Sequence, residues 1–287
     1  MAEMEEKGSN GGNAVDKKVA DALDNTGLFY WILKSMKNFN DQEVNGVLSG
    51  QLKTTDRENC FLLVHWRSVN NVDSMLELSD VRHFQTIANL ARTMLELAAD
   101  AHLLTSIPDS VQKLLYFNRL ERLRAARGIL KYESNHNLSI PLNTSTYKAF
   151  VATQEHQIEQ DGAILWPNLK LNTLKHWTGL NLQQRAVLVG QPLEEIYEFY
   201  NRILSWHVHS GGSGVMGLPP ESFPIMCSLG YRVAALTFEE VILQVAKEFK
   251  LYTVIDALEK KLAYAKALPL TSSPEQELQL AKELGLM

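Results

Sequence analysis

The feature that most constrains the fold is the spacing of apolar residues near the C-terminal end of the chain. Residues 236–268 read LTFEEVILQVAKEFKLYTVIDALEKKLAYAKAL. Two sets of large apolar side chains recur there at intervals of three and four: Phe238, Val241, Ile242, Val245 and Phe249, and then Leu251, Val254, Ile255, Leu258 and Leu262. Such intervals put each set on one face of an α-helix. The segment therefore predicts two amphipathic helices that pack on one core.

Most of the remaining chain has the same helical spacing, divided by recognisable helix starts and stops. Thr55 and Glu58 form a capping-box pattern, and Asn181 and Gly190 have the residue types that begin and end a short helix. Further helices are expected from Ser79 to Pro108, from about Asp109 to Lys131, from 146 to the Trp166-Pro167 pair, and from Pro192 onward. Strand-like alternation of convincing length does not occur.

The helix expected over 79–108 carries apolar or small residues on two faces. One face has Ile87, Leu90, Met94, Leu97 and Ala101, and the reverse has Ala88, Ala99 and Leu103 beside Arg92 and Glu96. A helix that is covered on both sides belongs inside a bundle. The predicted fold class is therefore all-α, a multi-helix bundle with a buried central helix.

Length and composition indicate how the chain is divided. With 287 residues and 45% hydrophobic content, the chain can bury a substantial core in one large domain or two small ones. The acidic, Gly- and Asn-rich residues 1–13 predict a disordered tail. We expect a helical domain over 14–267, either one unit or two sub-bundles that share one core, and a C-terminal linker with a short helix over 268–287.

The net charge, the length of the apolar runs and the number of cysteines indicate where the protein is located and which classes of partner it binds. The net charge of −5 gives no general attraction to nucleic acid or to an anionic membrane. The longest strongly apolar run, GLFYWIL, is far shorter than the roughly 20 residues that span a bilayer, and the acidic N-terminal residues lead us to expect no export signal. Cys60 and Cys227 suggest neither a disulfide framework nor a thiolate zinc site. We expect a cytoplasmic protein with no membrane partner.

The helix that begins at Pro192 contains the sequence IYEFYNRILSWHVHSGGSG, with two histidines before a run of glycines. On a helical wheel His207 falls in the apolar stripe, whereas Arg202 and His209 fall on the opposite side. At a helix C-terminus an imidazolium is favoured, and glycines allow close approach of a ligand. Each of these two residues also has a purely structural explanation. Arg202 could form an ion pair with Glu198, four residues earlier, and His209 could cap the C-terminus of the helix.

Arg92 and Glu96 lie four residues apart on one face of the helix over 79–108, flanked by alanines. The Arg-before-Glu order is the weaker one for a helix-stabilising pair, so helix stability alone explains the choice poorly. Buried charges need partners, because an uncompensated one costs several kcal/mol. We therefore expect His209 to converge on Arg92 and Glu96 as a third partner, with a purely structural ion pair as the alternative.

One stretch, residues 113–131, departs from the acidic average of the chain. Its basic residues are Lys113, Arg119, Arg122, Arg124, Arg127 and Lys131, and its single acid is Glu121. Such a strip is either a solvated helix face paired with acidic neighbours or a surface that contacts phosphates. On the second interpretation Arg119, Arg122, Arg124, Arg127 and Lys131 are the RNA-binding residues.

Three motifs, in order, resemble those of a prokaryotic helical family of unknown function. Its pattern is an Arg-x-x-x-Glu helix, a His-Trp-[Ser/Thr]-Gly turn and a Tyr-rich helix that ends in Ser-x-x-Val-His. The matching residues are Arg92 and Glu96, His176 to Gly179, and Tyr200, Ser205, Val208 and His209. The resemblance covers about residues 55–240 and implies no activity.

The chain is also loosely similar to HEPN-type ribonucleases, helical proteins in which an arginine and a histidine cleave RNA across a dimer interface. Arg202 with His209, or with His207, has a comparable spacing. The resemblance implies that the histidine moves the 2′-hydroxyl proton while the arginine holds the phosphate. Ile203 departs from the polar residue that usually follows this arginine.

Three functions therefore compete. We favour a non-enzymatic binding or scaffold protein in which Arg92, Glu96 and His209 form a polar clamp. The alternative is a metal-independent ribonuclease of a defence or toxin system, with Arg202 and His209 catalytic, Arg92 and Glu96 supporting, RNA as substrate and a homodimer as the assembly. A metal site built from Glu96, His207 and His209 is the third hypothesis. We expect no cofactor.

Overall fold

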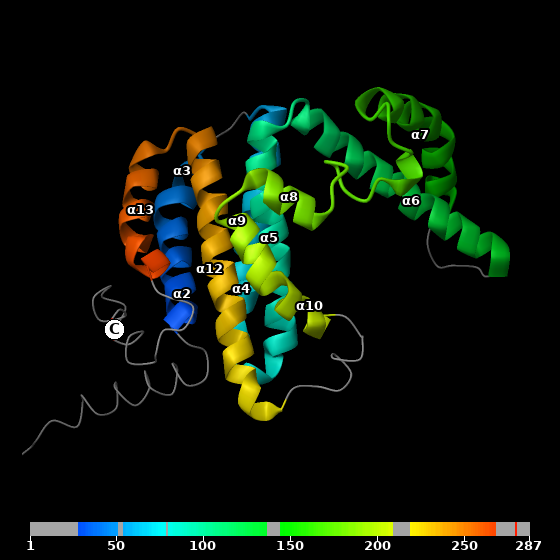
Figure 1. The fold of residues 1–287 in the computed structure, drawn as a ribbon. Coiled ribbons are helices and arrows are strands. Elements are labelled where there is room, and N and C mark those ends of the chain that lie inside the picture. The colour runs from blue at the N-terminus through cyan, green and yellow to red at the C-terminus, as the bar shows by residue number, and fades with distance from the viewer. Residues whose placement is uncertain are drawn as a thin grey trace, which may run out of the picture. The chain divides into compact units, whose positions relative to one another are not determined.

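The computed structural model describes residues 28–50, 54–78, 80–136, 144–208, 219–267 and 279. Within these residues all regular structure is helical (Figure 1), which confirms the predicted all-α class. The chain divides into two compact units: unit 1 combines the residues up to His102 with those from Gly190 onward, and unit 2 is Leu103–Val189. The predicted segments 1–13 and 268–287 lie outside the described residues, apart from Gln279. Each described helix is too short or too polar to span a bilayer.

Unit 1 contains most of the long helices. In chain order its elements are α2 (Leu28–Phe39), the π-helical turn η1 (Asn40–Asn45), α3 (Gly46–Leu48), α4 (Asp56–Glu77), the 3₁₀ turn η2 (Val81–His83), α5 (Phe84–Ser106, whose last residues belong to unit 2), α9 (Leu193–Ile196), the π-helical turn η4 (Tyr197–Asn201), α10 (Arg202–Val208), the 3₁₀ turn η5 (Pro220–Ser222), α12 (Phe223–Glu248) and α13 (Tyr252–Ala267).

The centre of unit 1 is α12. It packs against α2, α4 and α13, and its side chains are buried almost continuously from Met226 to Ala246. Gly230 lets it approach α5 closely, because a Cβ atom there would lie 2.7 Å from Cγ2 of Ile87. The sequence therefore predicted the α12–α13 break correctly. The predicted burial of α5 on two faces is also confirmed, since Ile87 and Met94 on one face and Ala88 and Leu103 on the other are fully buried.

Polar contacts fix both ends of α4. At its N-terminus the Thr55 hydroxyl accepts from the Glu58 backbone amide, and the Glu58 carboxylate accepts from the Thr55 amide, which confirms the predicted capping box. Arg57 donates two hydrogen bonds, of 2.7 and 3.0 Å, to the Glu248 carboxylate at the end of α12. At the C-terminus the Tyr231 hydroxyl of α12 lies 3.2 Å from two carbonyl oxygens of α4's last residues. These contacts set the register of α4 against α12.

Unit 2 is built on a hairpin of α6 (Ser110–His136) and α7 (Thr144–Leu165), followed by the 3₁₀ turn η3 (Leu171–Thr173) and α8 (Leu182–Val189). Its core is formed by Tyr116, Leu120, Leu123, Ile158, Trp166 and Leu174. The Tyr116 hydroxyl donates a 2.6 Å hydrogen bond to the carbonyl of Ile158, which ties α6 to α7. The predicted helices are confirmed, with α6 continuing past Lys131 to His136.

A buried polar pair marks the π-helical turn η1. Asn40, the first residue of the turn, and His65 of α4 are both fully buried, and His65 Nε2 lies 2.8 Å from Asn40 Oδ1. Burial lowers the pKa of His65 to about 4, and the nearby Asp41 carboxylate offsets only part of this effect. His65 is therefore neutral near pH 7, and its Nε2 carries the proton donated to Asn40.

Gly162→Ala tests how tightly α6 and α7 pack. A Cβ atom at position 162 would overlap the Tyr116 hydroxyl and lie 2.6 Å from Cδ1 of Leu171. Overpacking of this kind should lower the free energy of unfolding by about 2 kcal/mol, measured by urea denaturation. The control Gly128→Ala, with no atom within 4 Å, should stabilise the helix by up to about 1 kcal/mol. Equal effects at the two glycines would contradict this packing.

The depressed pKa of His65 predicts a loss of stability in mild acid. Between the unfolded pKa of 6.5 and the folded value of about 4, the unfolded chain binds a proton that the folded chain does not. The free energy of unfolding should therefore fall by about 2–3 kcal/mol from this residue as the pH is lowered from 7.5 to 4.5. His65→Gln should remove this pH-dependent fall. If the free energy of unfolding of the variant fell with pH as steeply as that of the wild type, the prediction would be contradicted.

Candidate functional site

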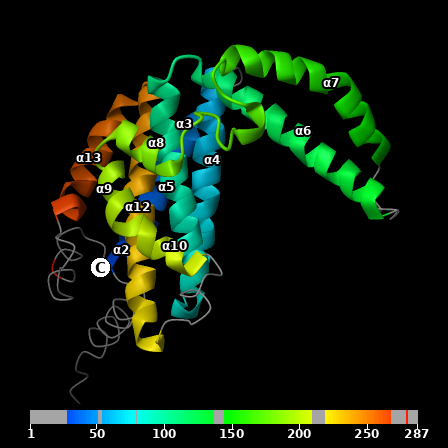
Figure 2. The same ribbon diagram turned by 45° about the vertical axis from the view of Figure 1, so that its right-hand side comes forward.

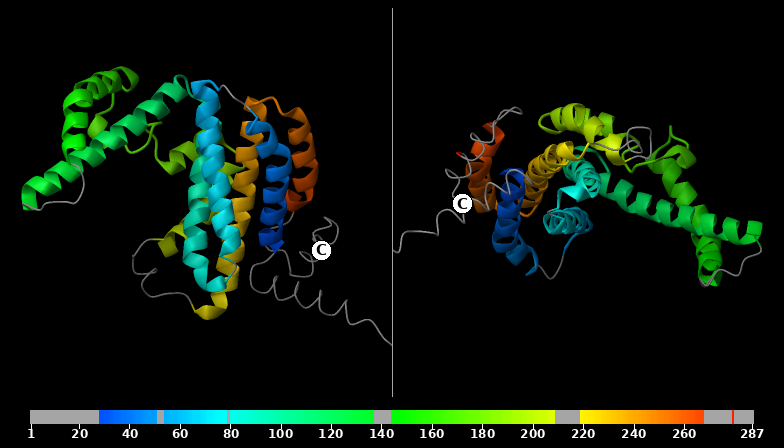
Figure 3. Two further views of the ribbon diagram at one scale, coloured as in Figure 1. Left: turned by 180° about the vertical axis from the view of Figure 1, so that it is seen from behind. Right: turned by 90° about the horizontal axis from the view of Figure 1, so that it is seen from below.

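The short elements α9, η4 and α10 lie against α5 and α12, on the side of unit 1 away from α2 and α4 (Figures 2 and 3). Their apolar stripe is buried as predicted, with Leu193, Ile196, Tyr200 and Leu204 each at most 6% exposed. Arg202 is exposed, which confirms its predicted outward position.

The π-helical turn η4 changes the wheel on which the sequence prediction was based. A π turn holds more residues than an α turn, so the ideal 100° step does not apply across Tyr197–Asn201. As a result Asn201 is buried beside the exposed Arg202. Burial raises the pKa of Tyr200, and the Arg232 guanidinium partly opposes this shift. The side chain of His207 and all of His209 lie outside the described residues, so the positions predicted for them stay predictions.

Arg92 and Glu96 form the predicted ion pair on α5, and they are partly buried. Arg92 Nε lies 3.9 Å from Glu96 Oε1, and the side chains are 26% and 41% exposed. The flanking alanines are buried, whereas these longer side chains extend toward the surface of the helix face. The predicted ion pair is therefore present, and its predicted burial is only partial.

A second polar group on α5, which the sequence prediction missed, is more deeply buried. His102 Nε2 lies 2.9 Å from the carboxylate of Glu240 on α12, whose side chain is 8% exposed. The Gln244 side-chain amide lies 3.3 Å from the same nitrogen. Because the Nε2–H of His102 that donates to Glu240 cannot also accept, the Gln244 amide must turn its oxygen toward His102. The same N–H then donates to both Glu240 and Gln244.

The sequence did contain a signal for this cluster. Glu239 and Glu240 interrupt the long apolar helix α12, and both are buried, with Glu239 only 1% exposed. Carboxylates inside such a helix require partners from neighbouring elements. A carboxylate that holds an imidazole can orient it for proton transfer, or it can fix two helices in register. Among the residues that the structure describes, no group of three or more His, Cys, Asp or Glu side chains is placed to hold a metal ion.

The His-Trp-Thr-Gly motif forms a rigid turn inside unit 2. Arg185 of α8, only 4% exposed, donates a 2.9 Å hydrogen bond to His176 Nε2. His176 must therefore carry its proton on Nδ1, which lies 2.9 Å from the Thr178 hydroxyl. Trp177 is fully buried, and Gly179 adopts a φ of +76°, a conformation that favours glycine. These contacts give the motif a structural role within the unit.

The basic strip on α6 faces the acidic side chains of α7. Arg119 lies 3.1 Å from the Asp161 carboxylate, and Arg127 bridges Glu155 and Glu159. Arg124 pairs with Glu121 of its own helix and donates to the carbonyl of Leu171. Arg122 and Lys131 are exposed. Three of the six basic residues of the strip therefore match the interpretation of a helix face paired with acidic neighbours.

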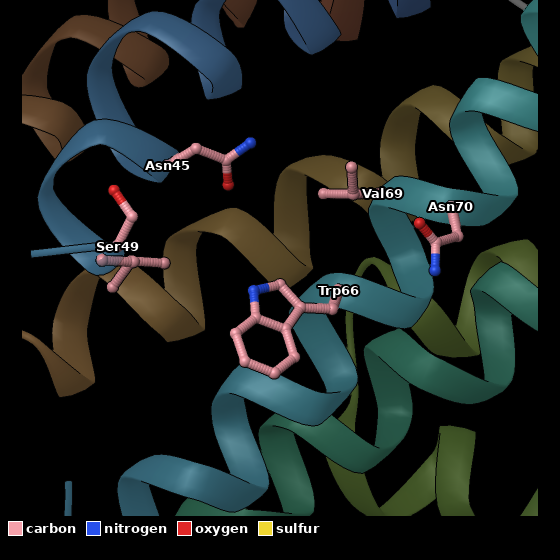
Figure 4. Close-up of a pocket in the computed structure, with 6 residues that line it drawn as sticks. Asn45, Ser49, Trp66, Val69 and Asn70 are labelled. Atoms are coloured by element: carbon pink, nitrogen blue, oxygen red, sulfur yellow. The ribbon is translucent and has the colours of Figure 1, made fainter. Parts of the chain in front are cut away.

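A surface groove of about 410 Å³ lies in unit 1 between the η1–α3 segment and α4. It is lined by Asn45, Leu48, Ser49, Trp66, Val69 and Asn70 (Figure 4). None of these six side chains is charged, so the groove suits an apolar or neutral polar group.

Comparison with protein families places these motifs in one group. The model of a family of unknown function, DUF5677, matches residues 58–218, more than half of the chain. The chain belongs to this family. The match contains Arg92, Glu96, the turn from His176 to Gly179, Arg202 and His209, so the predicted membership of a family of unknown function is confirmed. No curated protein and no solved structure matches the chain.

The Glu240–His102 pair predicts a graded loss of stability. Glu240→Ala removes a buried hydrogen-bond partner of His102 and should lower the free energy of unfolding by about 2 kcal/mol. Glu240→Gln keeps a hydrogen-bond acceptor, so it should lower the free energy of unfolding by less than about half of that amount. Glu195→Ala, at an exposed position, should leave the free energy of unfolding nearly unchanged. Urea denaturation of the three variants measures this order, and equal costs for Glu240→Ala and Glu195→Ala would contradict it.

Proposed function

We propose that this chain is a non-enzymatic helical binding or scaffold protein. The observation that carries the proposal is the pairing of the basic strip with acids of α7 and α6. An RNA-binding track gains its affinity from cations that neutralise phosphates. Here Arg119, Arg124 and Arg127 already neutralise carboxylates of their own chain, and the whole chain carries a net charge of −5.

In this proposal the polar clamp fixes the surface that a partner would meet. Arg92 and Glu96 project from α5 on a partly exposed face, and His209 follows α10 by one residue in the sequence. A contact between His209 and this pair would attach the end of α10 to α5. The clamp would then serve stability and surface shape, and the exposed Arg202 would be free to contact a partner.

A ribonuclease remains a second candidate because of the position of Arg202. This exposed arginine directly follows the π-helical turn η4, and π turns inside helices are frequent at functional sites. An arginine there could hold a phosphate while His209 moved the proton of the 2′-hydroxyl. That chemistry would need no metal ion.

Cleavage assays and melts of the same variants separate the two functions. The purified protein is incubated with single-stranded RNA in the presence of a chelator, beside denaturation of Arg202→Ala, His209→Ala and Glu96→Ala. We expect no cleavage by the wild type. We expect His209→Ala to lower the free energy of unfolding, Glu96→Ala to lower it by at most about 1 kcal/mol because that side chain is 41% exposed, and Arg202→Ala to leave it unchanged.

The opposite pattern would overturn the binding proposal. A wild type that cleaves RNA, with cleavage abolished by both Arg202→Ala and His209→Ala at unchanged stability, would identify a nuclease. Arg122→Ala is the matched control for an exposed arginine elsewhere in the chain. On the nuclease interpretation it weakens RNA binding without abolishing the chemical step.

A further inference from the structure

The side of unit 1 opposite α9–α10 is formed by the continuous α2–η1–α3 segment and by α4, which pack against each other (Figure 3). This side carries unusually exposed apolar side chains. Leu63 and Trp66 of α4 are each 55% exposed, and Val47 of α3 is 47% exposed. Trp66 directly follows the fully buried His65, so the backbone of α4 fixes the indole on the outer surface.

The exposed Trp66 borders the uncharged groove. Figure 4 shows its ring on the α4 side, with Asn45 and Ser49 of the other segment across the groove and Val69 and Asn70 further along α4. The same helix face therefore presents a projecting aromatic group and, next to it, a depression. A projection and a depression at neighbouring positions are what a two-fold interface requires, because each copy must offer both.

We propose that this face binds a second copy of the chain. The two α4 helices run antiparallel, with the two-fold axis close to Arg67–Val69. Trp66 of each copy then enters the groove of the other copy and lies on its Val69 and Asn70. Large, rigid aromatic side chains in a central pocket supply much of the energy of such interfaces.

The charge distribution of this face permits a second copy as the occupant. Each copy carries a net charge of −5, which opposes self-association, so the centre of the contact must be uncharged, and the lining of this groove contains no charged side chain. The acids Asp41 and Asp73 beside it are both paired with Lys37. Arg67 is exposed one residue after Trp66, so its guanidinium can lie over the Trp66 ring of the other copy. The antiparallel arrangement also opposes the dipoles of the two α4 helices.

The dimensions of the face match those of a small dimer interface. The 22 residues of α4 make the face about 33 Å long. One helix is about 10 Å wide, so α4 and the neighbouring α2–η1–α3 segment together make the face about 20 Å wide. That area is of the order of the roughly 800 Å² per partner that standard-size interfaces bury. The inference is independent of the proposed binding function, because Arg92, Glu96 and Arg202 do not belong to this face.

The oligomeric state of the full chain tests the proposal. Sedimentation equilibrium should give a dimer of twice 32.4 kDa for the wild type. Trp66→Glu would place a charge at the centre of the interface and should raise the dissociation constant by at least about 30-fold. The matched controls Tyr252→Glu and Phe199→Glu change equally exposed aromatic residues elsewhere in unit 1 and should leave the dimer intact.

Cross-linking tests the geometry without a charged substitution. Arg67→Cys places a thiol close to the proposed two-fold axis, so mild oxidation should join two copies, whereas Tyr252→Cys should not. The native Cys60 and Cys227 are buried and should not contribute. A monomeric wild type at 100 µM, a dimer unaffected by Trp66→Glu, or equal cross-linking through positions 67 and 252 would each overturn the proposal. Helical content and melting of each variant, measured by circular dichroism, show that loss of the dimer is not loss of the fold.

Discussion

The structure of unit 1 depends on the burial of α12. A helix surrounded by others can contain polar side chains only where a neighbouring helix provides hydrogen-bond partners. A buried polar group without a partner destabilises the fold by more than one hydrogen bond stabilises it. Tyr231 therefore reaches the end of α4, Glu240 reaches His102 of α5, and Glu248 reaches Arg57. Each contact fixes the position of one neighbouring helix. Because α12 lies beyond residue 218, α4, most of which lies within the family match, packs against a helix outside that match.

Two π-helical turns supply two of the buried polar side chains in this apolar core. Each places a buried asparagine in the bundle: Asn40 at the start of η1 and Asn201 at the end of η4. The extra residue of a π turn rotates the following side chains relative to an α-helix. In η1 this geometry holds Asn40 against His65, and in η4 it leaves Arg202 on the surface beside a buried amide. Local helix geometry thus determines which polar groups remain accessible.

The sequence predicted the features that depend on a single helix and not on its neighbours. The cap at Thr55, the stop at Gly190 and the apolar stripe from Leu193 to Leu204 follow from spacing and backbone preference. It could not predict partners that lie on other elements. Glu240 and His102 are 138 residues apart, and a helical wheel of α5 cannot show whether long side chains such as Glu96 reach its rim. Periodicity assigns a face to each helix, whereas pairing and exposure depend on what packs against that face.

The acidic face of α7 explains why a cationic sequence need not form a nucleic-acid surface. The side chains of Arg119 and Arg127 are 41% and 42% exposed, so their ion pairs are weak and a phosphate could displace them. Displacement would not remove the carboxylates, because Glu155, Glu159 and Asp161 would remain fixed on α7 within a few ångströms of the bound phosphate. Their repulsion would oppose the gain from each new phosphate contact. The net charge that a partner meets is therefore set by both helices of the hairpin, and it is less positive than the six basic residues of α6 alone suggest.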